Sequence, residues 1–256
     1  MKGIILAGGL GTRLRPLTLV TNKHLLPVYD QPMIYYPIAT LVNAGITDVL
    51  LVTGDEQAGD FIRLLKNGRH LGLRHLEYAY QEGNGGIADA LKLGEEFVEG
   101  ARVCVILGDQ VIENNICDAA ARFGGQRSGA KLVLKDVHDP ERFGVARFDA
   151  DPPEGRLVEI LEKPQEPPSR YAVIGIYFYD TAVFEICKQL KPSDRGELEI
   201  TDVNNAYLAR GDLTYDLLDG WWNDAGTFES LHQSSCLVAQ GGANHVEKPI
   251  RSGSNR

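Results

Sequence analysis

Short apolar runs alternate with helix-like stretches over the first half of the chain. Most of the runs are continuously apolar, which predicts buried strands, and residues 75–81 alternate between apolar and polar. Strands that alternate with helices at this spacing are typical of a parallel sheet with helices on both faces. The predicted strands are residues 3–5, 48–53, 75–81 and 102–107, and the predicted helices are residues 32–44, 61–66 and 86–98.

One of these predicted helices contains an internal proline. Pro32 suits the first turn of a helix over residues 32–44, and Gly45 suits its end. Pro37 lies inside the same segment. Because proline lacks the N–H that an interior helical position uses, Pro37 predicts a kink or an early break.

The pattern changes after residue 130, where strand candidates follow one another with few helices between them. We interpret this stretch as a strand-rich insertion on the α/β core, with a turn over residues 151–155. Strands are predicted at residues 131–137, 144–148, 156–161 and 173–179, and helices at 181–190, 199–209 and 227–240. We expect one domain over residues 1–240, made of halves 1–130 and 131–226 and a terminal helix 227–240, with a loose tail at 241–256.

Composition narrows the possible functions. The chain has 256 residues, 43% hydrophobic and 24% charged, which is ordinary for a globular protein. Its net charge of −9 argues against a nucleic-acid surface, and no apolar run is long enough to span a membrane. The four cysteines are widely spaced, which suggests neither disulfides nor a zinc site. A strand at the N-terminus is no secretory signal, so we expect a cytoplasmic protein.

A glycine-rich turn follows the first strand. Gly8, Gly9 and Gly11 allow backbone N–H groups to converge on an anion, and Arg13 adds a fixed positive charge. No Lys-Ser or Lys-Thr follows, which excludes a Walker loop, and Leu14 stands where a dinucleotide fingerprint needs its third glycine. Glycines can serve a tight turn alone, but this combination favours binding of a nucleoside triphosphate.

Two aspartates are candidate ligands for Mg²⁺. Asp109 follows the strand that ends near residue 107, at the sheet edge where ligands bind in α/β proteins, and Asp224 precedes a predicted helix. Each could instead cap the segment that follows it. The sequence alone does not bring the two together. Lys23 lies close enough to the glycine turn to neutralise the same phosphates, although most single lysines are solvated at the surface.

A second group of polar residues lies in the strand-rich half. Lys163 and Arg195 are candidates for binding a second phosphate, and Glu162 is a candidate acceptor for hydroxyl groups. Taken one by one, each is more often a surface residue. The six histidines show no metal-ligand spacing, and no Gly-x-Ser-x-Gly elbow occurs.

Ordered motifs along almost the whole chain carry a family resemblance. The chain resembles the sugar-1-phosphate nucleotidyltransferases, and within them the thymidylyltransferase branch. The shared stretches are residues 2–9, 11–14, 25–30, 32–37, 107–109, 139–145, 162–164, 175–180 and 195–201. The resemblance implies a three-layer, Rossmann-like, mostly parallel sheet and assigns the strand-rich insertion to sugar binding.

The resemblance also implies a reaction and a set of residue roles. A nucleoside triphosphate, here dTTP, reacts with a sugar 1-phosphate, here glucose 1-phosphate, to give a nucleotide sugar and pyrophosphate by direct in-line attack with Mg²⁺. Family members are usually dimers or tetramers. The catalytic positions are Arg13, Lys23 and Lys163; the nucleotide-binding positions are Leu6, Gly8, Gly9, Gly11, Thr12, Arg13, Gln81, Gly86 and Asp109; the sugar-phosphate positions are Gly144, Glu162, Lys163, Val173 and Arg195; and the metal ligands are Asp109 and Asp224.

The chain departs from the family pattern at several points. His24 and Gln110 stand where glutamine and asparagine are usual, and residues 81–88 lack the usual Pro-Asp-Gly. The chain resembles a short form without the C-terminal helices that help to form a secondary nucleotide site. Use of UTP or of another sugar 1-phosphate stays open as an alternative. So does a non-catalytic regulator that binds sugar nucleotides.

Overall fold

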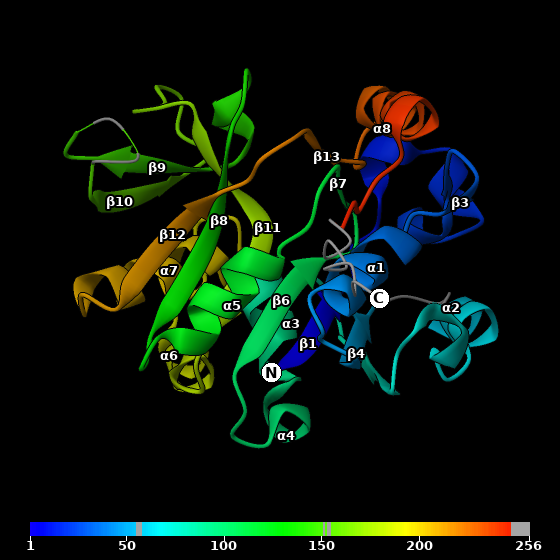
Figure 1. The fold of residues 1–256 in the computed structure, drawn as a ribbon, viewed down its shortest axis with the longest axis horizontal. Coiled ribbons are helices and arrows are strands. Elements are labelled where there is room, and N and C mark those ends of the chain that lie inside the picture. Colours follow the sequence, from blue (N-terminus) through cyan, green and yellow to red (C-terminus); the bar gives the residue numbers. More distant parts are fainter. Residues whose placement is uncertain (55–57, 151, 153–154, 247–256) are drawn as a thin grey trace, which may run out of the picture.

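The predicted strands of the first half form a parallel sheet. This computed structural model describes residues 1–54, 58–150, 152 and 155–246. The strands are β1 (Lys2–Leu6), β4 (Asp48–Thr53), β5 (His75–Tyr80) and β6 (Val103–Leu107). They lie in the order β5-β4-β1-β6, and every neighbouring pair is parallel. Figure 1 labels β4, β1 and β6, which lie next to one another near the N-terminus. The sequence-based expectation for this half is confirmed.

The strand-rich second half continues the same sheet. Its strands are β8 (Ala130–Asp136), β9 (Gly144–Phe148), β10 (Leu157–Glu162), β11 (Tyr171–Tyr179) and β12 (Leu213–Leu217). The long strand β11 runs antiparallel to β6 and also pairs with β8 and β9, so it joins the two halves. Strand β12, which the sequence pattern did not predict, pairs with β8 in parallel.

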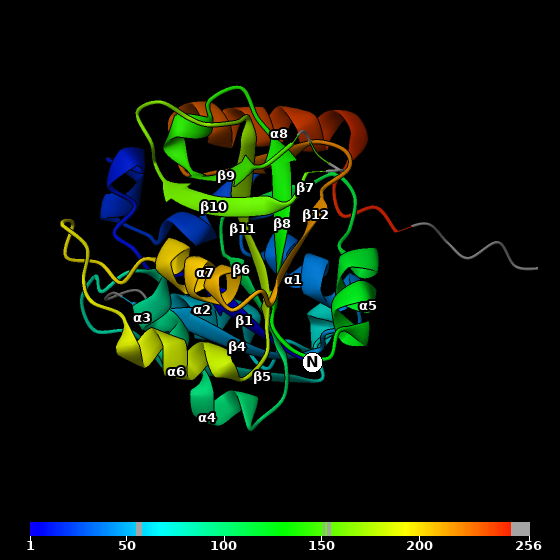
Figure 2. The same cartoon turned by 90° about the vertical axis from the view of Figure 1, so that its left-hand side faces the viewer.

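Helices cover both faces of the sheet. Successive side chains of a strand point to opposite faces, so a continuously apolar strand presents an apolar surface on each face. Ile4 belongs to one buried cluster and its neighbour Ile5 to the other. The first cluster includes side chains of α3 (Ile87–Lys92), α4 (Glu95–Val98), α6 (Ala182–Gln189) and α7 (Ile200–Ala209). The second includes side chains of α1 (Tyr35–Asn43), α2 (Ala58–Leu65) and α5 (Cys117–Gly125). The predicted three-layer α/β architecture is confirmed (Figure 2).

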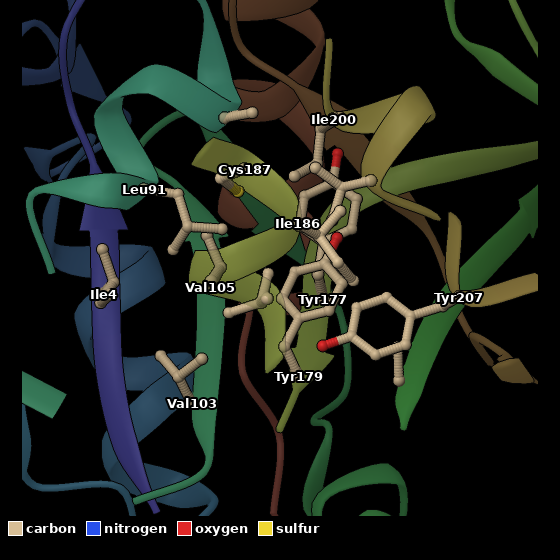
Figure 3. Close-up of a cluster of buried hydrophobic side chains, with 14 of the residues drawn as sticks. Ile4, Leu91, Val103, Val105, Tyr177, Tyr179, Ile186, Cys187, Ile200 and Tyr207 are labelled. Atoms are coloured by element: carbon tan, nitrogen blue, oxygen red, sulfur yellow. The ribbon is translucent and has the colours of Figure 1, made fainter. Parts of the chain in front are cut away.

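Aromatic stacking ties β11 to α7 in the first cluster. The ring of Tyr179 stacks on Tyr177 and on Tyr207, with centroid separations of 6.0 and 5.7 Å (Figure 3). The Tyr179 hydroxyl donates a hydrogen bond to the buried Asn204 side chain at 2.6 Å. Tyr177 also lines the cavity described below, so this packing supports one of its walls.

Two helix predictions were wrong in detail. Helix α1 begins at Tyr35, so Pro37 lies in its first turn. Backbone N–H groups in the first turn of a helix have no carbonyl partner within the helix, so a proline there removes no hydrogen bond and gives no reason for a kink. The predicted helix over residues 86–98 is two helices, α3 and α4. They meet at Gly94, where a Cβ atom would lie 2.3 Å from Cδ1 of Ile4. Glycine at this position allows the chain to pack directly on β1.

Two short ribbons and a final helix complete the fold. Strands β2 (Pro27–Val28) and β3 (Gln31–Pro32) pair with each other, as do β7 (Gln110–Ile112) and β13 (Trp222–Asp224). Helix α8 (Phe228–Gly241) begins with a capping box between Thr227 and Ser230. No helix among the described residues is long and apolar enough to cross a membrane.

The segment expected to be a loose tail begins with anchored residues. The Asn244 side chain accepts a hydrogen bond from Thr40 at 2.8 Å and donates one to the Tyr36 carbonyl at 3.0 Å, which ties it to α1. Residues 247–256 lie outside the described residues, as does most of the turn predicted at 151–155.

Candidate active site

A cavity of about 580 Å³ opens at the carboxyl ends of β1, β5 and β6. This is the edge at which ligands bind in open α/β sheets. Every residue that the sequence singled out for a site lines this cavity, although they come from both halves of the chain. They are Leu6, Gly8, Gly9, Gly11, Thr12, Arg13, Lys23, Gln81, Gly86, Asp109, Gly144, Glu162, Lys163, Val173, Arg195 and Asp224.

The turn after β1 needs its glycines. Gly9 and Gly11 have φ angles of 98° and 57°, which side chains rarely adopt. A Cβ atom on Gly11 would also lie 2.8 Å from Cγ2 of Thr18. A single turn of 3₁₀ helix follows over Thr12–Leu14, and the buried Leu14 anchors it. The turn therefore holds its backbone at the cavity wall without side chains in front of it.

Arg13 reaches from this turn toward Gly226 and Asp224. A Cβ atom on Gly226 would lie 3.2 Å from an Arg13 guanidinium nitrogen, so glycine at position 226 leaves room for the guanidinium group. Asp224 lies near enough that the charge of Arg13 acts on its pKa. The cation predicted to hold phosphate thus lies beside one of the two candidate metal ligands.

Asp109 is a buried carboxylate with several partners. Lys23 Nζ lies 2.6 Å from its Oδ2 atom, and the Gln110 amide donates to its Oδ1 atom at 3.1 Å. The indole N–H of Trp222 donates to Gln110 Oε1 at 2.7 Å and so turns the amide N–H group toward Asp109. Burial alone would raise the pKa of Asp109, but the charge of Lys23 and these hydrogen bonds hold it well below its ordinary value.

Asp224 lies next to Asp109 because β7 and β13 pair with each other. Asp224 is in register with Gln110, and the N–H of Ala225 donates to the Asp109 carbonyl at 3.0 Å. Arg142 approaches Asp224 Oδ1 at 3.4 Å. Burial, followed by the charge of Asp109, raises the pKa of Asp224 to about 6. The charge of this second carboxylate is therefore only partly compensated by the protein.

These two neighbouring carboxylates fit a divalent cation. Mg²⁺ prefers carboxylate, water and phosphate oxygens, and its charge would offset the burial and the repulsion from Asp109 that together raise the pKa of Asp224. Within the described residues, no group of three or more His, Cys, Asp or Glu side chains could hold a metal ion. A cation between Asp109 and Asp224 would complete its coordination with water and ligand oxygens.

The opposite wall carries the polar residues of the second half. Arg195 forms a bidentate ion pair with Glu199 at 3.1 and 2.8 Å and also contacts Glu162 Oε1 at 3.1 Å. Glu162 Oε2 accepts a hydrogen bond from the Thr201 hydroxyl at 2.5 Å. A fixed carboxylate of this kind can accept hydrogen bonds from the hydroxyl groups of a ligand.

Three further predicted residues frame Glu162. Gly144 pairs with Glu162 in the sheet, and a Cβ atom on Gly144 would be 3.6 Å from Glu162 Oε2. Lys163 has a φ angle of 43° and a half-exposed side chain, and its Nζ atom is 3.5 Å from Glu162 Oε1. Val173 is buried and pairs with Gly144 in the sheet.

Sequence reasoning missed several residues of this site. Arg142 lines the cavity, lies between Asp139 and Asp224, and belongs to a shared motif that could have drawn attention to it. Trp222 orients Gln110 through a pairing of two three-residue strands that no periodicity marks. His24 is buried under Gly108, and burial, helped by the charge of Lys23, lowers its pKa to about 3, so it is neutral.

Comparisons with known proteins decide the family. The model of the nucleotidyl transferase family matches residues 2–241. The chain belongs to this family. It is 47% identical to a glucose-1-phosphate thymidylyltransferase of Neisseria meningitidis serogroup A, over 93% of this chain and 82% of the relative. It is 48% identical to the enzyme of the same name from an Actinoplanes species, over 89% of this chain and 74% of the relative. The chain is thus an enzyme of the sugar nucleotidyltransferase kind.

Solved structures agree with this assignment. A protein from Bacillus anthracis, assigned as a glucose-1-phosphate thymidylyltransferase and solved in complex with sucrose, is 52% identical with a TM-score of 0.87, over 93% of this chain and 94% of that one. A UDP-glucose pyrophosphorylase complexed with UDP-glucose is 24% identical with a TM-score of 0.82, over 93% and 98% of the two chains. The second likeness is one of fold.

Proposed function

We propose that the chain condenses dTTP with glucose 1-phosphate to give dTDP-glucose and pyrophosphate. The observation that supports this most directly is the composition of the cavity described above. It combines a glycine turn and a neighbouring arginine, two adjacent carboxylates, and a separate wall with Glu162, Lys163 and Arg195. Two anionic reactants need two cationic regions and a place where their phosphates meet. The relatives named above carry this activity in their names.

In the proposed reaction, a phosphate oxygen of glucose 1-phosphate attacks the α-phosphorus of dTTP. The bond between the α-phosphorus and the bridging oxygen to the β-phosphate breaks, and pyrophosphate leaves. No covalent enzyme intermediate is required. Because both reactants are anions, the barrier is largely one of position and electrostatics.

The chain's own residues supply the positioning. The glycine turn offers backbone N–H groups to the phosphates of the nucleotide, and Arg13 offsets the charge that develops on the leaving pyrophosphate. Lys23 neutralises charge at the same place from its position beside Asp109. Lys163 and Arg195 bind the phosphate of the sugar substrate, and Glu162 accepts hydrogen bonds from its hydroxyl groups. Glu162 is suited to that role because Thr201 and Arg195 fix both of its oxygens.

Asp109 and Asp224 would hold Mg²⁺. When bound, the cation supplies Lewis-acid stabilisation of phosphate oxygens. Of the two carboxylates, Asp224 is the more sensitive probe, since the protein compensates its charge less well than that of Asp109.

Replacement of Asp224 by asparagine tests this proposal. Pyrophosphate release is followed with dTTP, glucose 1-phosphate and Mg²⁺, and with UTP in place of dTTP. We expect Asp224→Asn to lose about 100-fold or more in kcat. The variant should unfold at the same or a higher temperature than the wild type, because the folded state disfavours the ionised carboxylate.

The matched control is Asp118→Asn on α5, whose side chain is 90% exposed. It should retain both turnover and stability. A wild-type protein that releases no pyrophosphate from dTTP and glucose 1-phosphate would overturn the proposed reaction. An Asp224→Asn variant with full turnover would overturn the assigned role of this carboxylate.

A further inference from the structure

One end of the cavity is left over once the phosphates and the sugar are assigned. The glycine turn and the two aspartates take the phosphates, and the Glu162 wall takes the sugar. The remaining lining includes Gln81, Asn84, Gly86, Ile87 and Ala90. These residues combine apolar contacts with side-chain amides, which suits a nucleobase with a polar edge.

Gln81 lies at the end of β5 with its amide held in one orientation. Its Nε2 atom donates to the Gly86 carbonyl at 3.2 Å and to Asp89 Oδ2 at 3.0 Å. A side-chain amide has two N–H donors, so both are used within the protein. The Oε1 atom lies on the other side, over Gly8, where a Cβ atom would be 3.2 Å away. Glycine at position 8 therefore leaves this oxygen open to the cavity.

The opposite orientation of the amide is excluded by chemistry. It would place Oε1 against a carbonyl oxygen and a carboxylate, which are both acceptors. Asp89 is held in turn by Lys92, with Nζ 2.8 Å from Oδ1. Burial alone would raise the pKa of Asp89, but hydrogen bonds from Lys92 and Gln81 lower it, so the carboxylate is ionised at neutral pH. Gly85 leaves room for the Asp89 carboxylate, because a Cβ atom there would clash with it.

We propose that Asp89, fixed by Lys92, is a positioning residue that makes Gln81 a hydrogen-bond acceptor toward the base. The inference rests on the proposed function and on the nucleotide-binding position that the family resemblance gives to Gln81, and it concerns the side chains that fix the orientation of its amide. In this orientation Gln81 Oε1 can accept a hydrogen bond from a base N–H group, such as N3–H of thymine or uracil. The relay runs from Lys92 through Asp89 to Gln81, and only Gln81 among the three touches the base.

A pair of nucleotides that differ in this N–H group tests the proposal. The probes are dTTP and its N3-methyl derivative, with glucose 1-phosphate and Mg²⁺. The measured quantity is the kcat/KM value for dTTP divided by that for the N3-methyl derivative. The steric effect of the methyl group is common to all variants, so it cancels when this ratio is compared between them. In Asp89→Asn, Lys92 attracts the asparagine oxygen, and the asparagine NH₂ group turns to Gln81. The Gln81 amide then keeps only the Gly86 carbonyl as an acceptor and meets a donor in place of the carboxylate, so it is no longer held in one orientation.

We expect Asp89→Asn to lower this ratio by about three- to ten-fold, the scale of one hydrogen bond between neutral groups. The loss should appear as a higher KM for dTTP with kcat little changed. Lys92→Met, which keeps Asp89, should lower the ratio less, in the same direction. The matched control is Glu185→Gln, which removes a surface pair of the same i,i+3 kind with Lys188 at 2.8 Å on α6. It should leave the ratio unchanged.

An unchanged ratio in Asp89→Asn would overturn the inference, and Lys92→Met decides the matter if Asp89→Asn does not fold. Failure of the proposed reaction is a separate outcome. If the wild type releases no pyrophosphate, calorimetry still gives the dissociation constants of the two nucleotides, and their ratio takes the place of the kcat/KM ratio. Tighter wild-type binding of dTTP than of its N3-methyl derivative, reduced in Asp89→Asn, would then support the inference alone.

Discussion

Replacing Lys23 by methionine should expose how much the fold depends on compensating Asp109. Methionine keeps most of the apolar stem and removes the ammonium group that lies 2.6 Å from Asp109 Oδ2. The two side chains are only 14% and 10% exposed, so water cannot replace the lost partner well. The variant leaves a buried carboxylate with Gln110 as its remaining side-chain donor among the contacts described above.

The size of the effect follows from the burial of the pair. Breaking a buried ion pair by removing one partner costs about 3–5 kcal/mol, and the residual exposure places this pair near 3 kcal/mol. For a chain of this size, that corresponds to a fall of about 6–12 °C in melting temperature. In the wild type, the depressed pKa of Asp109 contributes stability that is present above the unfolded-state pKa and is lost as pH falls through the folded-state pKa.

Thermal unfolding of wild type and Lys23→Met, at several pH values and with or without Mg²⁺, measures this effect. The deficit of the variant should be largest near pH 7 and should shrink toward pH 4, where Asp109 of the variant takes up a proton. Mg²⁺ should also reduce the difference in melting temperature between wild type and variant, because the cation replaces the missing positive charge beside Asp109 and stabilises the folded state, which binds it. Equal melting temperatures without Mg²⁺, or a gap that Mg²⁺ does not change, would refute this reasoning.

Two further predictions use other parts of the structure. Because the pKa of Asp224 is raised to about 6, the carboxylate is ionised above this pH and protonated below it. The Mg²⁺ concentration for half-maximal pyrophosphate release should therefore rise about ten-fold per pH unit below 6, and a constant value from pH 7 to 5 would contradict the assignment. Gly94→Ala should destabilise the fold by about 1–3 kcal/mol in denaturant unfolding, because its Cβ atom would overlap Ile4. The control is Gly124→Ala in α5, where a Cβ atom would meet nothing within 4 Å, and it should not lower the free energy of unfolding.

The parts of the fold that sequence could predict are those with a local cause. Three strands of the parallel sheet follow from continuous apolar runs, and β5 follows from alternation of apolar and polar residues. The glycine turn follows from Gly9 and Gly11, whose φ angles other residues rarely adopt. Asp109 could be placed at the ligand-binding edge because a strand ends just before it. These features depend on neighbours within a few residues, which is the range over which periodicity carries information.

The parts that could not be predicted depend on contacts between distant segments. Asp109 and Asp224 meet because β7 pairs with β13, and each of these strands has three residues, too few for a pattern. The break between α3 and α4 depends on how closely Gly94 approaches Ile4, which no helical periodicity reveals. The orientation of Gln81 depends on Asp89, and a sequence shows neither the contact nor its direction.

Several cations of the cavity are paired with carboxylates, which bears on how ligands bind. Lys23 is paired with Asp109, Arg142 with Asp224, and Arg195 with Glu162 and Glu199. A ligand phosphate that takes one of these cations leaves a carboxylate in need of another partner. For the two aspartates, a divalent cation that arrives with the polyphosphate would supply that partner, so we expect metal and nucleotide to favour each other's binding. Glu162 keeps the Thr201 hydroxyl as a donor, and Glu199 keeps the Ser193 hydroxyl. In the proposed function, the acidic chain would thus bind two anionic substrates, since the charges that matter are those within the cavity and not the overall sign.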